Sequence, residues 1–252
     1  GCCGIDIYKL SNTLKFEIPQ LFQSENGVIV KPQKGTYYGE DDNYDQYALL
    51  DFIEFMFFTV RDISSRCWHS YYRHDDISFR TTNEVAYDFR NDINNIFDKT
   101  GLLYTLSETG MVERIDKTGI VSTEIENEIS QVSEKGLKEL LQDAILLYKT
   151  PSPQARQDSV EKIWDALERL KTYYTDMDKK TSANKIVNDM ANDRAEFVTI
   201  FNAEFKELTD IGNNFRIRHH ETNKIDITDL RHYDYFFNRC LSLIALAIQY
   251  LK

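Results

Sequence analysis

The sequence contains few of the residues that interrupt regular structure. Only 10 glycines and 4 prolines occur among its 252 residues. This scarcity argues against a loop-rich or all-β chain, because tight turns depend on those two residue types. Hydrophobic residues make up 42% of the chain, enough for a substantial core, and the length suits one large domain or two smaller ones. We therefore expect a mainly helical protein.

Cysteine is scarce as well. Four cysteines, at positions 2, 3, 67 and 240, are too few and too scattered for a disulfide framework. No second Cys or His pair accompanies Cys2 and Cys3, so we predict neither a metal site nor another cofactor. Free thiols fit a reducing compartment, and no basic segment followed by an apolar one opens the chain. We therefore expect a cytoplasmic protein.

The sequence also lacks an excess of positive charge and a long uninterrupted apolar run. Its formal net charge of −11 means that RNA would need a local basic site, and it disfavours anionic membrane surfaces. The longest apolar stretch, residues 236–251, is interrupted by Asn238, Arg239 and Gln249. It is too short and too polar to cross a bilayer, so we predict no membrane contact and a buried helix instead.

The chain changes character near residue 120, which we take as the boundary between domains 1–120 and 121–252. The first is predicted to be a small α+β domain and the second an all-α helical bundle, because apolar residues there recur every three or four positions. A helix is expected to end at Gly101, and strand 14–18 could add to a hairpin. The expected helices span 47–66, 82–99, 125–148, 154–173, 183–190, 193–213 and 230–251, a polar joint covers 179–182, and the hairpin pairs 102–107 with 111–116.

One polar cluster could carry chemistry, and it follows the helix expected at 193–213. If that helix continues, Phe215, Arg218 and His219 extend its apolar stripe while Arg216 and His220 lie four apart on its flank. An imidazole can move a proton at neutral pH, and a guanidinium can clamp a phosphate. This combination predicts a metal-free ribonuclease. The candidate catalytic residues are Asn214, Arg216, Arg218, His219, His220 and Glu221.

Two other interpretations of this cluster stay open. Arg, His and Glu at a helix end often only cap the helix and pair with one another. A metal held by His219, His220 and Glu221 is disfavoured, because adjacent histidines on a helix point in different directions.

The order of helices after residue 130, the segment Trp164-Asp165-Ala166-Leu167-Glu168 and the Arg/His cluster before a long final helix together resemble a HEPN domain. The most similar variety is the C-terminal domain of bacterial abortive-infection proteins. The first half resembles the N-terminal domain of those proteins through residues 50–54, 69–74 and 77–79. The resemblance implies a metal-independent endoribonuclease in antiviral defence. It also implies a homodimer with both motifs in one cleft, and a possible antitoxin or defence partner protein.

The cluster departs from the HEPN pattern. In that pattern Arg is followed by a polar residue, and four to six positions separate the Arg from a His. Arg216 and His220 are separated by three residues, and Ile217 is apolar. Arg218 is followed by a polar residue, but no His stands at positions 223–225. The alternative function is therefore a non-catalytic HEPN-like module that dimerises or senses a ligand or RNA.

A second cluster, in residues 67–79, combines cations with aromatic rings. The cations His69, Arg73 and His74 are mixed with the aromatic residues Trp68, Tyr71 and Tyr72, as in grooves that bind single-stranded nucleic acid. The alternative is that the aromatic residues fill the N-terminal core while the His and Arg side chains cap the helix that begins near residue 47.

Overall fold

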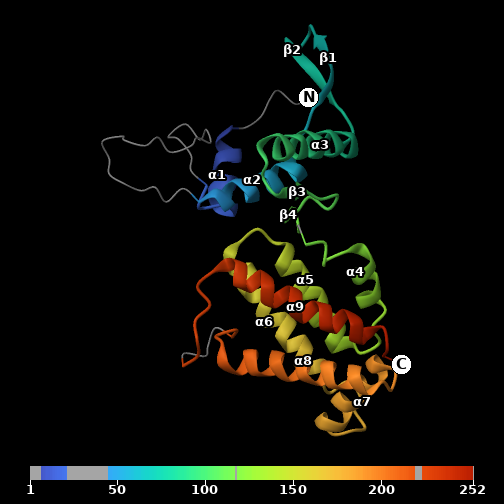
Figure 1. The fold of residues 1–252 in the computed structure, drawn as a ribbon. Helices are drawn as coiled ribbons and strands as arrows, with labels where there is room; N and C mark the ends of the chain where they lie inside the picture. Colours follow the sequence, from blue (N-terminus) through green and yellow to red (C-terminus); the bar gives the residue numbers. More distant parts are fainter. Residues whose placement is uncertain (1–6, 22–44, 117, 219–222, 252) are drawn as a thin grey trace. The chain divides into compact units, whose positions relative to one another are not determined.

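The structure is a computed structural model that describes residues 7–21, 45–116, 118–218 and 223–251. Within them the chain is mainly helical, with short strands confined to its first half (Figure 1). The predicted fold class, mainly α with a small α+β part, is confirmed. The chain divides into two compact units, residues 1–113 and 114–252, and each has hydrophobic clusters of its own. The boundary expected at residue 120 lies a few residues further along.

The first unit combines three helices with two β-hairpins among its described residues. The longest helix, α3, begins with a capping box between Thr81 and Glu84 and ends at Gly101, whose φ of +70° is the left-handed conformation expected there. The elements are α1 (Ile7–Glu17), α2 (Gln46–Thr59), β1 (Ile63–His69), β2 (His74–Phe79), α3 (Thr82–Thr100), β3 (Tyr104–Leu106) and β4 (Val112–Arg114).

The strand expected at 14–18 is wrong, because those residues belong to helix α1 and the turn that follows it. Leu10, Leu14 and Ile18 recur every four residues, and this helical face packs against Ala48 of α2. Five residues are too few to distinguish the two-residue period of a strand from the 3.6-residue period of a helix.

The helix expected at 47–66 is too long, because α2 ends at Thr59. Val60 is extended, with ψ 137°, and β1 begins three residues later. The segment 67–79 is therefore a β-hairpin.

The hairpin expected at 102–116 is confirmed, with shorter strands β3 and β4. Side chains of neighbouring helices form hydrogen bonds with the backbone of this hairpin. The side chain of Asn94 in α3 accepts from the Leu106 N–H at 2.6 Å and donates to the Leu106 carbonyl at 3.1 Å. On β4, the Glu54 carboxylate of α2 accepts from the Val112 N–H at 2.7 Å. These side chains take the place of a third strand.

In the second unit, α9 lies against α6 and buries much of its length (Figure 1). Phe237, Leu241 and Ile244 are fully buried, which confirms that the final helix is a core helix. The helices are α4 (Thr123–Ser130), α5 (Lys135–Lys149), α6 (Pro153–Leu170), α7 (Lys179–Ala191), α8 (Ala195–Asn214) and α9 (Leu230–Ile248).

Two details of the expected bundle are wrong. The helix expected at 125–148 is two helices, because Glu134 caps α5 by accepting from the N–H groups of Gly136 and Leu137. The polar joint expected at 179–182 is the first turn of α7, capped by Asp178. In both places a capping side chain outweighed the apolar pattern.

Candidate functional site

The polar cluster begins where α8 ends. Phe215 is extended, with φ −96° and ψ 151°, so the helix does not continue through the cluster as supposed. A parallel bridge forms instead: the Arg216 N–H donates to the Ile225 carbonyl at 2.8 Å, and the Ile225 N–H donates to the Asn214 carbonyl at 3.0 Å. The Lys224 ammonium donates to the carbonyl of Asn213. Together these bonds satisfy groups at the C-terminal end of α8.

Apolar contacts anchor this segment to the bundle. Ile217 is 1% exposed and belongs to the main hydrophobic cluster, and the ring of Phe215 lies 5.6 Å from that of Phe236 in α9. The Ile217 N–H donates to the Phe215 carbonyl at 2.9 Å, which closes a three-residue turn around Arg216. The backbone that carries the two arginines is therefore held in place.

Both candidate arginines form ion pairs with aspartates. Arg216 contacts Asp226 at 3.1 Å, and Arg218 contacts Asp165 of α6 at 2.8 Å. The two arginine side chains are 37% and 40% exposed, so solvent reaches both pairs. Arg218 leaves the apolar stripe on which it was expected. Asn214 is exposed in the last turn of α8.

The remaining candidates, His219, His220 and Glu221, lie outside the described residues. Among the residues that are described, the capping interpretation is only partly met. Lys224 and the bridge satisfy groups at the end of α8. The arginines pair with aspartates from other parts of the chain.

The segment 164–168 that contributed to the HEPN resemblance lies within α6 and holds this region together. Trp164 donates its indole N–H to the Leu208 carbonyl of α8 at 3.0 Å, and Asp165 binds Arg218. Burial raises the pKa of Glu168, but hydrogen bonds from Lys171 and Lys179 outweigh it and keep that pKa below its usual value. The acidic residues of this segment thus have structural partners.

The second cluster lies at the tip of the β1–β2 hairpin. His69 and His74 face each other in the register, and Arg73 occupies the turn with φ +54°. Trp68, Tyr71 and Tyr72 are 61%, 83% and 63% exposed. The alternative in which these aromatics fill the N-terminal core is therefore wrong. Sequence reasoning also missed Asp76, which contacts both histidines and becomes their neighbour only through strand pairing.

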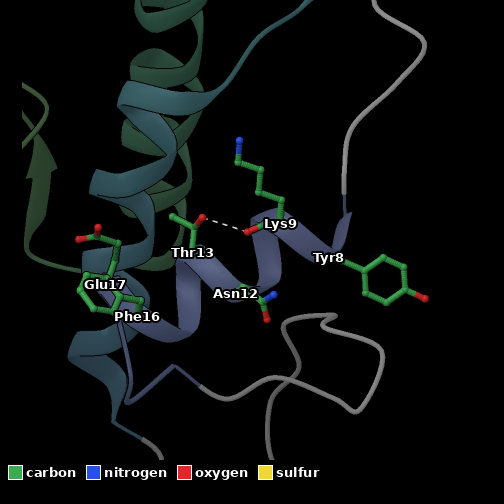
Figure 2. A pocket seen from close by; sticks show the side chains of 6 residues that line it. All are labelled: Tyr8, Lys9, Asn12, Thr13, Phe16 and Glu17. Atoms are coloured by element: carbon green, nitrogen blue, oxygen red, sulfur yellow. Dashed lines mark hydrogen bonds between the residues drawn. The ribbon is translucent and has the colours of Figure 1, made fainter.

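Two surface hollows of the first unit offer little chemistry. One lies along a single face of α1 and is lined by Tyr8, Lys9, Asn12, Thr13, Phe16 and Glu17 (Figure 2). All six come from one helix, and Thr13 donates its hydroxyl to the Lys9 carbonyl at 2.9 Å. The other lies between α2, α3 and the β3–β4 turn, where Arg90 pairs with Glu108 at 3.0 Å. Neither brings a His or Cys side chain together with a carboxylate.

Comparison of the chain with protein-family models, with curated proteins and with solved structures found no match. Among the described helices, none combines the length and apolar character that crossing a membrane requires.

Proposed function

We propose that the chain is a metal-independent endoribonuclease of the HEPN type that acts in bacterial phage defence, with its site in residues 214–221. The observation that supports this proposal is the pair Arg216 and Arg218. Buried Ile217 and the bridge to Ile225 anchor the backbone of this pair directly before His219 and His220.

The proposed reaction transfers a phosphoryl group within the RNA. One imidazole, of His219 or His220, removes the proton of a 2′-hydroxyl as its oxygen attacks the adjacent phosphorus. The bond from phosphorus to the 5′-oxygen breaks, and the other imidazole protonates that oxygen. The products are a 2′,3′-cyclic phosphate and a 5′-hydroxyl end. Arg216 or Arg218 holds the charged phosphate, and Asn214 and Glu221 orient the reacting groups.

The observed ion pairs are compatible with this role. Arg216–Asp226 is an exposed ion pair and Arg218–Asp165 a partly buried one that solvent still reaches. Exposed pairs contribute roughly 0–1 kcal/mol, so a phosphate can replace the aspartate on Arg216 at the smaller cost. A guanidinium binds phosphate in two-pronged fashion, as it does carboxylate. Arg216 pairs with the nearby Asp226, and Arg218 pairs with Asp165 of α6.

The test incubates total tRNA and a single-stranded RNA pool with the purified protein in EDTA. We expect wild type to cleave and the variant His219→Ala/His220→Ala to lose cleavage by about 10²–10⁴-fold, the usual contribution of general acid–base groups. The control His232→Ala removes an exposed imidazole at the start of α9, outside both polar clusters, and should cleave like wild type. Full activity in His219→Ala/His220→Ala would refute the proposal.

A second candidate function is a non-catalytic HEPN-like module that dimerises or senses a ligand or RNA in a defence or toxin–antitoxin system. The observation that favours it is that each arginine already binds an aspartate of its own chain. This candidate predicts RNA binding or dimerisation without turnover by wild type. Cleavage that depends on His219 and His220 would exclude it.

A further inference from the structure

The β1–β2 hairpin has no core of its own. No residue of β1 or β2 is buried, although the tip carries Trp68, Tyr71 and Tyr72. A two-stranded hairpin without a packed face is marginally stable in water. A further stabilising interaction is therefore expected at this hairpin.

The register gathers four metal-ligating side chains on one face of this ribbon. His69 pairs with His74, and Cys67 pairs with Asp76. Residues two apart on a strand share a face, and directly paired residues share it too. Cys67, His69, His74 and Asp76 therefore form a two-by-two arrangement, while the neighbouring pair Trp68 and Asp75 belongs to the opposite face.

The distances among His69, His74 and Asp76 are close to those of a metal site. Asp76 lies 3.5 Å from Nδ1 of His69 and 3.2 Å from Nε2 of His74, and the ligand atoms of all three residues lie within 4.8 Å of one another. Tetrahedral zinc, with bonds of about 2.0–2.2 Å, holds its ligand atoms roughly 3.3–3.6 Å apart. The two contacts are near this spacing but involve different oxygens of Asp76. The thiol of Cys67 lies outside this close group of three, so binding of a metal requires the exposed hairpin to bring it nearer.

Aromatic contacts hold both imidazoles. The ring of Tyr72 stacks on that of His74, with centroids 5.8 Å apart and planes 10° apart, and it meets the edge of His69 at 4.8 Å. The two imidazoles themselves lie 5.9 Å apart. Side-chain order of this kind lowers the entropy cost of binding a metal.

We propose that His69, His74 and Asp76 bind a divalent zinc ion on this face of the hairpin, with the thiolate of Cys67 as the fourth ligand. Nitrogen, oxygen and sulfur ligands in a tetrahedral set suit zinc. The ion joins β1 to β2 and supplies the stability that the missing core does not. The proposal does not depend on RNA cleavage, which needs no metal and involves other residues.

The test uses the full-length, tag-free protein after removal of metal with EDTA. Zn²⁺ is titrated with a competing chromophoric chelator, and bound metal is measured by mass spectrometry after dialysis. We expect one equivalent to bind wild type and the control His219→Ala/His220→Ala, and none to bind His69→Ala/His74→Ala. Wild type without bound zinc, or full binding by His69→Ala/His74→Ala, would overturn the proposal.

A pair of adjacent substitutions tests the geometry without removing a histidine. Asp76→Asn should weaken zinc binding, whereas Asp75→Asn, on the opposite face, should leave it unchanged. Equal effects of the two would contradict the assigned face. Circular dichroism serves as the folding control. The hairpin contributes no helix, so each variant should keep the helical signal of wild type.

Substituting Co²⁺ tests the fourth ligand. A thiolate-to-cobalt charge-transfer band is expected in wild type and should be absent in Cys67→Ala. Zinc should also protect Cys67 from alkylation, whereas Cys240 is protected with or without zinc because it is fully buried. Protection of Cys67 by RNA but not by zinc would instead assign this face to nucleic acid.

Discussion

Two glycines with different surroundings show how single residues fix the second unit. A Cβ at Gly212 of α8 would lie 2.5 Å from the indole Nε1 of Trp164, a ring buried in the core. A Cβ at Gly136 of α5 would meet only the guanidinium of Arg169, at 2.9 Å, which can move. The close contact of α8 with α6 therefore requires glycine at position 212.

This contrast makes a testable prediction. Gly212→Ala should lower the free energy of unfolding by about 1–3 kcal/mol, because overpacking displaces Trp164 or α8. The control Gly136→Ala should cost less than Gly212→Ala, because only the end of the Arg169 side chain has to shift and alanine favours a helix by up to about 1 kcal/mol over glycine. Urea unfolding of both variants measures the difference. Equal destabilisation would contradict the described packing.

The acid dependence of stability should also involve one residue. The Arg169 guanidinium, together with the N–H groups that cap α5, lowers the pKa of Glu134 from 4.5 to about 2. A lowered folded-state pKa stabilises the protein above pH 4.5, and this contribution is lost as pH falls toward 2.

Removing this carboxylate should therefore reduce the loss of folding stability at acid pH. The free energy of unfolding of Glu134→Gln should depend less on pH than that of wild type between about pH 5 and pH 2. Glu139→Gln, an exposed change in the same helix, serves as the control and should follow wild type. Thermal unfolding across this pH range is the measurement, and identical slopes for wild type and Glu134→Gln would refute the link.

At the scale of elements, the long helices were predictable because their signals are local. The apolar spacing in 82–99 and 193–213 recurs over several turns, and each corresponds to a helix with bounds within a few residues. The β1–β2 hairpin was missed for the opposite reason. Neither of its faces is buried, so the sequence carries no alternation of apolar and polar residues to reveal it.

The candidate site shows the same limit. Its residue types stand out in the sequence, but the pairing of Arg218 with Asp165 joins positions far apart and could not be read from spacing. The end of α8 depended on Ile225, ten residues beyond Phe215, whose backbone bridge competes with continuation of the helix. Tertiary contacts of this kind override local helical preference.

The β3–β4 hairpin gives a prediction at this scale. Asn94→Ala removes the side chain that bonds both backbone groups of Leu106 and should cost about 1–3 kcal/mol, since it leaves partly buried groups unpaired. Asn95→Ala, an exposed neighbour on α3, should cost little. Chemical unfolding compares the two variants. An unchanged free energy of unfolding in Asn94→Ala would show that the hairpin does not depend on the hydrogen bonds from Asn94.

At the scale of the whole molecule, the proposed nuclease is expected to act as a homodimer, with the Arg/His segments of two copies in one cleft. Much of the apolar surface of α9 is buried within its own bundle. Sedimentation of the purified protein should give twice the chain mass of 29.6 kDa at the concentrations used for cleavage assays. A monomer that cleaves RNA at full rate would contradict this expectation.

The chemical ends of the RNA products test the central claim most directly. RNA treated in EDTA with wild type, and with Arg216→Ala/His220→Ala as the inactive reference, is analysed for its terminal groups by mass spectrometry. Attack by the 2′-hydroxyl predicts 2′,3′-cyclic phosphate and 5′-hydroxyl ends from wild type alone. Products with 3′-hydroxyl and 5′-phosphate ends that form only when a divalent metal is added would contradict the proposed mechanism.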